Sequence, residues 1–578
     1  MQKTLARFLL AALIATGCTF HTHEGSNIEL SSRETFSTHT TATAVDEAPP
    51  PPPAPEAKPG ETSSGFDSTN VYGGVMALQE GQMGVSGVVG TGRYGTLGSG
   101  GGGTGTGYGY GSGRGGMRGR YAMADGQSGE SYKQYDANGW TEAAKDKLST
   151  FAADVDTASY TIARRKLTEG TLPPTASVRV EEMVNYFRYA YPAPAAGTPF
   201  AVTSELAPSP FDASKKILRV GVSTKQLSVS ERKPANLVFL VDVSGSMSSP
   251  DKLPLAKRSL RILVDNLADG DTVSLVTYAG STRVVLPPTG LTNRNRILAA
   301  IEDLQSGGST AMGDGIQLAY AQAEQGLRPG TISRVIVLSD GDANVGRTSH
   351  DQILATIQGK VKEGVTLSTI GFGMGNYKDE TMEQLADKGN GNNFYIDGIS
   401  QAKRVFQEQL GSTLEVVAKD VKLQVDFDAT QVKKYRLIGY ENRDVADSDY
   451  RNDKVDAGEI GAGHQVTALY ELELAAARSD APLATVRVRH KAPNGTAATE
   501  AAFPVTISAP TFAAASADLQ FALAVAAFGD ILRGGADAKQ WSLSTVRSIA
   551  AGAAGTHDDR KELVQLVDRA IELRKKTT

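Results

Sequence analysis

Cysteine is almost absent from this sequence, with Cys18 the only one among 578 residues. A single thiol excludes an intramolecular disulfide, a zinc knuckle and a site built from several cysteines. Histidine is also scarce, at seven residues, and the histidines do not form the H-E-x-x-H spacing of a zinc protease. We therefore expect neither thiol chemistry nor a histidine-based metal site.

A strong charge of one sign is lacking as well. The chain has 59 basic and 64 acidic residues and a net charge of −5, which argues against a dedicated nucleic-acid binder. After residue 18, no run reaches the roughly 18 apolar residues that a transmembrane helix needs. The length and the 40% hydrophobic content instead predict a globular protein of two to four domains.

Residues 1–18 have the pattern of a secretory signal. Lys3 and Arg7 precede an apolar stretch, and small residues lead to Cys18. The ending A-T-G-C resembles the bacterial lipobox, in which the cysteine is lipidated and becomes the mature N-terminus; ordinary cleavage with a spare thiol is the alternative. By the Gram-negative sorting pattern, Thr19 favours the outer membrane. We expect a protein of the cell envelope that is anchored by lipid alone.

The segment 19–144 has the composition of a disordered Pro/Gly-rich tether. Residues 48–60, APPPPPAPEAKPG, predict a stiff polyproline-type spacer, and 84–121 is rich in glycine. Arginines and tyrosines in the glycine-rich part could stack on nucleic acid or glycans. Because the chain as a whole is acidic, we favour a flexible tether.

The rest of the chain divides by its hydrophobic periodicity. Helical spacing predicts an N-terminal helical region and a C-terminal helical tail, and two β-rich stretches flank a region in which strands and helices alternate. The economical architecture is an α/β domain inserted into a β-sandwich. The predicted parts are 145–196 (helical), 197–232 and 416–510 (β-sandwich), 235–415 (α/β domain) and 511–578 (helical).

The α/β region predicts a doubly wound, mostly parallel sheet. Its strands are largely apolar and are separated by amphipathic helices, which is typical of a sheet covered on both faces. The strand at 282–288 follows its neighbour after a tight turn, so we expect an antiparallel edge strand that ends at Pro287 and Pro288. Ligands bind such sheets beyond the carboxyl ends of the strands, where the strand order reverses.

Polar side chains stand at that edge of the predicted sheet. The first strand ends in D-V-S-G-S, the fourth ends in L-S-D, and a glycine-rich loop, S-G-G-S-T, opens the third helix. A buried strand tolerates an acid only where something pairs with it. The converging side chains are Asp242, Ser244, Ser246, Thr310 and Asp340. This all-oxygen set suits Mg²⁺ or Mn²⁺, with Ca²⁺ as an alternative, and not zinc.

Other acidic residues have less specific interpretations. Asp314 and Asp342 lie near the predicted ligands in sequence, and they are either outer-shell acceptors or solvated loop residues. The motif DVDTAS at 154–159 lacks a preceding buried strand, so we expect it to cap a helix. The acidic stretch 447–459 lacks the spacing of an EF-hand loop, and we interpret it as a polar loop.

These residues carry a family resemblance. The region 235–415 resembles a von Willebrand factor type A (VWA) domain, and D-x-S-x-S with Thr310 and Asp340 matches its metal-ion-dependent adhesion site (MIDAS) position by position. LSTFAADVDTASY, VRVEEMVNYF, GYENR and DAGEIGAGHQVTALYE are similar to segments of the bacterial YfbK-like VWA proteins. The resemblance extends over 146–575.

The resemblance implies a way of binding. Ser244, Ser246 and Thr310 would bind the metal through hydroxyls, and Asp242 and Asp340 directly or through water. Neutral ligands leave the ion electron-poor, so an acidic side chain of a partner protein can fill its open position. In integrin-type relatives this contact shifts the last helix, here 400–414.

The leading hypothesis is an envelope protein that binds a partner protein through this cation. One alternative is an envelope scaffold that acts through the β-sandwich and the C-terminal helices, and a less favoured one is a metal-dependent hydrolase. Because no histidine lies near Ser244 or Ser246 in sequence to activate a nucleophile, we do not expect an enzyme.

Overall fold

The computed structural model describes residues 120–123, 130–228, 231–309, 311–341, 349–373, 377–455, 457–475, 482–493, 495–505 and 508–577. All of them belong to one compact unit, Thr106–Thr578. The predicted signal, Cys18 and most of the predicted tether lie outside the described residues. Among those described, no helix is long and apolar enough to cross a membrane.

The last part of the predicted tether is ordered, so that prediction is wrong for 130–144. Strands β1 (Arg120–Met123) and β2 (Ser131–Gln134) pair antiparallel. Tyr132 is buried, and the buried Glu130 accepts ion pairs from Arg165 and Lys166 at 2.7 and 2.9 Å. These partners lie far along the chain, which is why composition alone did not reveal the order.

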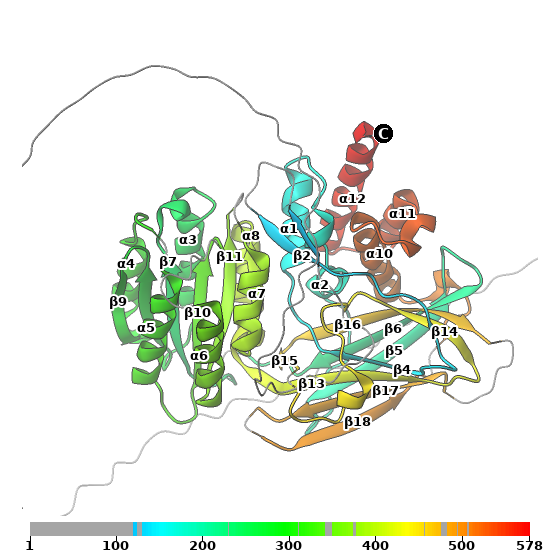
Figure 1. The fold of residues 1–578 in the computed structure, drawn as a ribbon, viewed down its shortest axis with the longest axis horizontal. Helices are drawn as coiled ribbons and strands as arrows, with labels where there is room; N and C mark the ends of the chain where they lie inside the picture. The colour runs from blue at the N-terminus through cyan, green and yellow to red at the C-terminus, as the bar shows by residue number, and fades with distance from the viewer. Residues whose placement is uncertain are drawn as a thin grey trace, which may run out of the picture. The chain divides into compact units, whose positions relative to one another are not determined.

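A six-stranded sheet forms the α/β domain, in the order β12-β11-β10-β7-β8-β9 (Figure 1). All neighbouring pairs are parallel except β8 and β9, which confirms the mostly parallel sheet with an antiparallel edge. The strands are β7 (Ala235–Asp242), β8 (Thr272–Tyr278), β9 (Thr282–Gly290), β10 (Ile332–Ser339), β11 (Val365–Phe372) and β12 (Asn393–Ile396).

Helices cover both faces of this sheet. Leu237, Phe239 and Val241 of β7 pack on one face with α3, α4 and the last helical segments, while Val238 and Leu240 face α5, α6 and α7. The helices are α3 (Leu253–Asp265), α4 (Arg294–Glu302), α5 (Met312–Gln325), α6 (His350–Lys362) and α7 (Asp379–Lys388). The predicted last helix, 400–414, consists of α8 (Ile399–Lys403), a π-helix (Arg404–Glu408) and α9 (Leu410–Leu414).

Strand β9 does not end at its prolines as predicted. It runs to Gly290, and its register against β8 shifts between the Val273–Thr289 and Leu275–Leu286 pairs. Proline lacks the N–H that a ladder needs, but an edge strand has a free side and a bulge removes residues from the pairing. The edge position therefore tolerates both prolines.

Two further five-stranded sheets share one buried core, which includes Val220, Val425 and Tyr470. Their orders are β15-β13-β17-β18, with β4 also on β13, and β3-β14-β16-β6-β5. The strands are β3 (Thr141–Glu142), β4 (Leu148–Ala152), β5 (Phe200–Pro208), β6 (Lys215–Thr224), β13 (Val416–Phe427), β14 (Val432–Ile438), β15 (Gly458–Gly461), β16 (Gln465–Leu474), β17 (Ala484–Lys491) and β18 (Ala498–Pro504). Because β4 pairs with β13, the start of the region predicted as helical is a strand.

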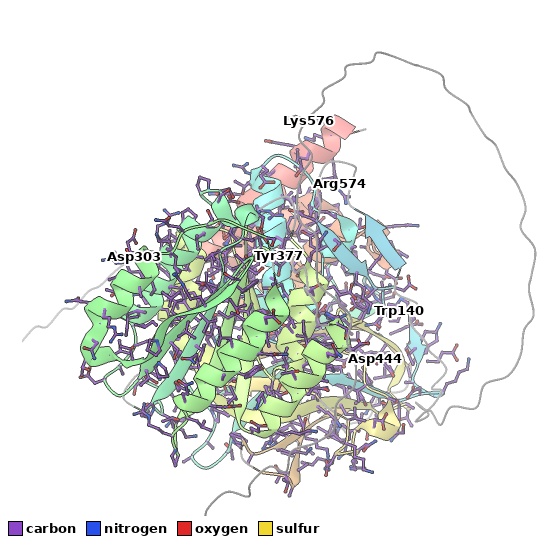
Figure 2. The ribbon with its side chains drawn as sticks, turned by 60° about the vertical axis from the view of Figure 1, so that its left-hand side comes forward. Trp140, Asp303, Tyr377, Asp444, Arg574 and Lys576 are labelled. Atoms are coloured by element: carbon purple, nitrogen blue, oxygen red, sulfur yellow. The ribbon has the colours of Figure 1, made fainter. Side chains whose placement is uncertain are left out.

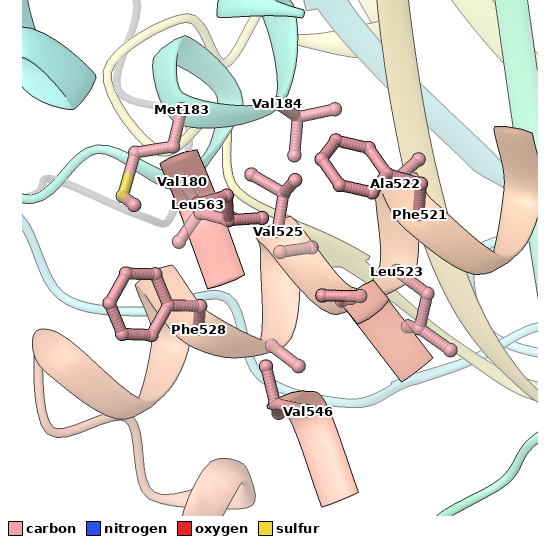
Figure 3. Packing of buried hydrophobic residues seen from close by; sticks show 14 of the residues in the cluster. Val180, Met183, Val184, Phe521, Ala522, Leu523, Val525, Phe528, Val546 and Leu563 are labelled. Carbon is pink, nitrogen blue, oxygen red and sulfur yellow. The ribbon is translucent and has the colours of Figure 1, made fainter. Parts of the chain in front are cut away.

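A helical group packs on the second of these sheets. Helices α1 (Ala158–Thr168), α2 (Val180–Tyr186), α10 (Ala517–Leu532), α11 (Leu543–Ala553) and α12 (Asp558–Thr577) form one hydrophobic cluster. Figure 3 shows Val180 and Met183 of α2 facing α10, with Val546 and Leu563 from the last two helices nearby. Ile217, Ile438 and Leu469 join the same cluster from the sheet. The C-terminal helices are therefore part of the core.

Asp154 and Asp156 do not cap helix α1, contrary to the prediction. The cap residue Thr157 makes no side-chain bond to the helix. Asp154 instead accepts the N–H of Asp156, and Asp156 accepts the N–H of Asn393 at 2.8 Å. Both carboxylates also pair with Arg443, at 3.3 and 3.1 Å. They serve tertiary contacts that no local pattern encodes.

A buried carboxyl group in α2 predicts a pH effect. Burial, and then the charge of Glu441, raises the pKa of Glu181 to about 8. Its Oε2 accepts the N–H of Tyr440 at 2.9 Å. Because the folded pKa lies above the unfolded value of 4.5, this group lowers stability as the pH rises from 4.5 to 8 and has no effect below 4.5.

We expect Glu181→Gln to raise the free energy of unfolding by up to about 4 kcal/mol at pH 8, because a neutral amide removes the cost of ionising this site. At pH 4.5 the variant and the wild type should unfold at the same denaturant concentration. Urea titrations at both pH values measure the difference. Glu302→Gln, at an exposed position, is the control, and an equal gain at both pH values would contradict the prediction.

Candidate metal centre

The site lies where the strand order reverses. Strand β7 lies between β10 and β8. From β8 the chain adds β9 on one side of the sheet, and from β10 it adds β11 and β12 on the other side. The register pairs Leu338 of β10 with Val241 of β7, so the two strands end side by side. Asp242 is the last residue of β7, and Asp340 follows directly after β10. Parallel packing thus brings together two acids almost a hundred residues apart.

Asp242 is buried and held in a fixed orientation. One carboxylate oxygen accepts the N–H of Ser244 at 2.9 Å, and the other accepts the hydroxyl of Ser339 at 3.0 Å. Burial raises the pKa of Asp242 to about 6, the charge of Asp340 adds to the rise, and the bonds from the serines oppose it. Two carboxylates that repel each other in a buried site are stabilised by a cation between them.

Ser244 and Ser246 turn toward each other beyond the strand end. Their hydroxyl oxygens are 3.0 Å apart. The N–H of Gly245 donates to the carbonyl of Gly308 at 3.0 Å, which joins this turn to the loop that leads to α5. Gly308 has φ +86°, and a Cβ there would lie 3.2 Å from the N atom of Gly280. Glycine is needed for this close approach of the loops.

Asp340 is fully buried and has a cationic partner that the sequence did not predict. Lys252 is the residue just before α3, and its ammonium lies 3.0 Å from Oδ2 of Asp340. A basic residue at a helix N-terminus is unfavourable for the helix dipole. That mismatch in P-D-K-L-P is the signal from which Lys252 could have been suspected.

The described structure therefore gathers Asp242, Ser244, Ser246 and Asp340 around the ends of β7 and β10. Thr310 and Asp342 lie outside the described residues, and Asp314 is an exposed residue in the first turn of α5. Within the described part of the chain, no group of three or more His, Cys, Asp or Glu side chains could hold a metal. A metal here would need the serine hydroxyls, and two acids with hydroxyls fit a hard divalent ion.

Three family models match successive parts of the chain. Residues 236–408 match the model of the von Willebrand factor type A domain, 126–219 match a von Willebrand factor model, and 412–573 match the C-terminal model of the uncharacterized protein YfbK. The Escherichia coli protein YfbK is 40% identical over 467 residues, which are 76% of this chain and 80% of that protein.

Solved structures with similar folds are more distant. A von Willebrand factor type A protein from Catenulispora acidiphila has a TM-score of 0.39 and 16% identity, and the match covers 64% of this chain and 89% of that one. The proximal thread matrix protein 1 of the mussel byssus, with a zinc-occupied MIDAS motif, has a TM-score of 0.27 and 22% identity, and the match covers 32% and 46%. Likeness at this level does not extend to function. The extended match to YfbK shows that this chain belongs to the YfbK family of VWA-domain proteins.

Proposed function

We propose that the protein is a lipid-anchored protein of the bacterial cell envelope that binds a partner protein through a divalent cation in its VWA domain. The observation that supports it most is the convergence of the buried Asp242 and Asp340 with the hydroxyls of Ser244 and Ser246 at the point where the strand order reverses. The lipobox pattern ending at Cys18 supports the anchor, and Thr19 supports the outer membrane.

Each residue has a distinct part in this proposal. Ser244, Ser246 and Thr310 would bind the cation through neutral oxygens, and Asp242 and Asp340 would balance part of its charge. Bound there, Mg²⁺ would supply a strongly electrophilic position that accepts a carboxylate. The bonds from Ser244 and Ser339 fix the Asp242 carboxylate before any partner arrives, which lowers the ordering cost of binding.

We do not propose catalysis as the main role. Oγ of Ser244 lies 3.0 Å from that of Ser246, and the Asp242 carboxylate, the acid next to Ser244, would be engaged with the cation. An activated serine needs a base that takes its proton. Turnover of a phosphoester or peptide panel that is lost in Asp340→Asn would favour a metal-dependent hydrolase instead.

Asp242→Asn tests the metal. The change keeps the size of the side chain but removes one of the two acids, so we expect Mn²⁺ affinity to fall at least about 100-fold by calorimetry. The wild-type protein should capture a partner from envelope extracts and release it when chelator is added. The Asp242→Asn variant should not capture this partner. Asp303→Ala, an exposed acid just after α4 (Figure 2), is the control that should behave as wild type. Unchanged Mn²⁺ affinity in Asp242→Asn would reject the proposed site.

The scaffold alternative needs a test that leaves the core intact. Deletion of 511–578 removes α10, whose Leu523, Val525 and Phe528 are completely buried. Such a deletion would unfold the protein whatever its function. An envelope phenotype that survives Asp242→Asn would favour the scaffold.

A further inference from the structure

Lys252 is a buried cation next to the candidate metal centre. Its side chain is 8% exposed, and its ammonium lies 3.0 Å from Oδ2 of the fully buried Asp340. Lysine is almost never this deeply buried unless it is paired. A contact between two buried charges is strong because little water screens it.

The backbone just after β11 limits the space for the stem of Lys252. A Cβ on Gly373, directly after β11, would come within 2.2 Å of Cγ of Lys252, so only glycine leaves room for the stem. Gly373 has φ +77°, and its carbonyl accepts bonds from Arg165 at 3.0 Å and from the hydroxyl of Tyr395 at 2.5 Å. Arg165 is in turn paired with Glu130. Lys252 is therefore built into the site rather than placed there by chance.

We infer that Lys252 sets the metal affinity of this site, because its ammonium and a divalent ion compete for the same carboxylate. The inference rests on the proposed metal centre and deepens it. Asp242 and Asp340 together carry two negative charges, and Lys252 cancels one of them. Among these three side chains, a divalent ion that enters meets a summed charge of −1 instead of −2, and it also meets direct repulsion from the ammonium. Lys252 thereby makes the site a weak metal binder.

Lys252→Met tests this role with the metal alone. Methionine keeps an unbranched stem against Gly373 and removes the charge, so we expect Mn²⁺ to bind at least about tenfold more tightly in the full chain. The Kd is measured by calorimetry and by the electron paramagnetic resonance signal of free Mn²⁺. Adding Mn²⁺ should also raise the melting temperature of this variant more than that of the wild type.

Lys360→Met is the matched control. Lys360 forms an ion pair with Glu363 at 2.8 Å near the end of α6, which starts at the metal edge of the sheet and runs away from it. We expect this variant to bind Mn²⁺ as the wild type does. Lys252→Gln is the second neutral variant, because its amide can still donate to Asp340 if the methionine form does not fold.

The outcomes separate this inference from the proposed function. If the wild type binds Mn²⁺ and both neutral variants bind it equally or more weakly, the role of Lys252 is wrong and the metal centre stands. If neither the wild type nor the variants bind Mn²⁺, both the inference and the proposed metal centre are overturned. If Lys252→Met and Lys252→Gln bind Mn²⁺ more tightly than the wild type and Lys360→Met does not, the inference is supported.

Discussion

Arg443→Met is expected to lower the free energy of unfolding by about 3–5 kcal/mol, as the removal of one partner from a buried ion pair does. Arg443 lies between β14 and β15, and its guanidinium contacts four carboxylates. Its distances are 3.3 Å to Asp154, 3.1 Å to Asp156, 3.6 Å to Glu383 and 2.9 Å to Asp387. Three of these acids are nearly or fully removed from water.

The variant loses stability because buried carboxylates remain without the guanidinium that paired with them. Burial, and then the charge of Asp154, raises the pKa of Asp156 well above its ordinary value even with the arginine present. Without the guanidinium, Asp154 and Asp156 would lose the cation that both of them contact, and Glu383 of α7 would keep only its ion pair with Arg179 at 3.6 Å. The same contacts join α7 of the VWA domain to the β-sandwich and to the segment before α1. We therefore expect the variant to loosen the attachment of the VWA domain as well.

Urea denaturation and hydrogen exchange measure both effects. Exchange should increase first in α7 and in the segment before α1, because the lost contacts hold these parts together. Arg451→Met is the control, since Arg451 forms an exposed ion pair with Glu500 at 2.9 Å. An exposed pair contributes about 0–1 kcal/mol. Equal destabilisation by the two variants would contradict the role given to Arg443.

Phe521→Ala is expected to cost about 3–5 kcal/mol, the usual range for truncating a buried aromatic side chain. Phe521 is completely buried, and Figure 3 shows it on α10 near Ala522 and Leu523. Its ring meets that of Phe187 edge-on, with centroids 4.9 Å apart, and the guanidinium of Arg560 lies 4.7 Å from its centroid. One side chain thus joins α10 to the end of α2 and to α12.

Thermal and urea unfolding measure this cost. Leu327→Ala, at a position that is 44% exposed, is the control and should change stability by less than about 0.5 kcal/mol. If Phe521→Ala lowered the free energy of unfolding as little as Leu327→Ala does, the proposed sharing of one core by the C-terminal helices and α2 would be contradicted. Mn²⁺ affinity should stay at the wild-type value in folded Phe521→Ala, because the site lies in a different hydrophobic cluster.

Local patterns in the sequence were sufficient for most elements of the α/β domain. The third amphipathic segment of this region, 312–325, coincides with α5, and the apolar segment SRVIVLSD at 333–340, which ends in the L-S-D noted above, differs from β10 by one residue at each end. Alternating apolar strands and amphipathic helices reflect burial on two faces, which is a local property of the chain. The predictions failed for β2 and β4. The N–H of Ser131 in β2 donates to the carbonyl of Tyr377, and β4 pairs with β13, so both partners lie far along the sequence.

By itself, the sequence determined the fold class, the family resemblance and the polar residues at the ends of β7 and β10, because strand ends and motif spacings are written in consecutive residues. Only the tertiary structure decided that Lys252 reaches Asp340, that Arg443 joins four carboxylates and that Asp154 and Asp156 leave α1 uncapped. These contacts depend on how separate segments pack. A buried charge takes whichever opposite charge the packing brings within reach, and no local pattern encodes that choice.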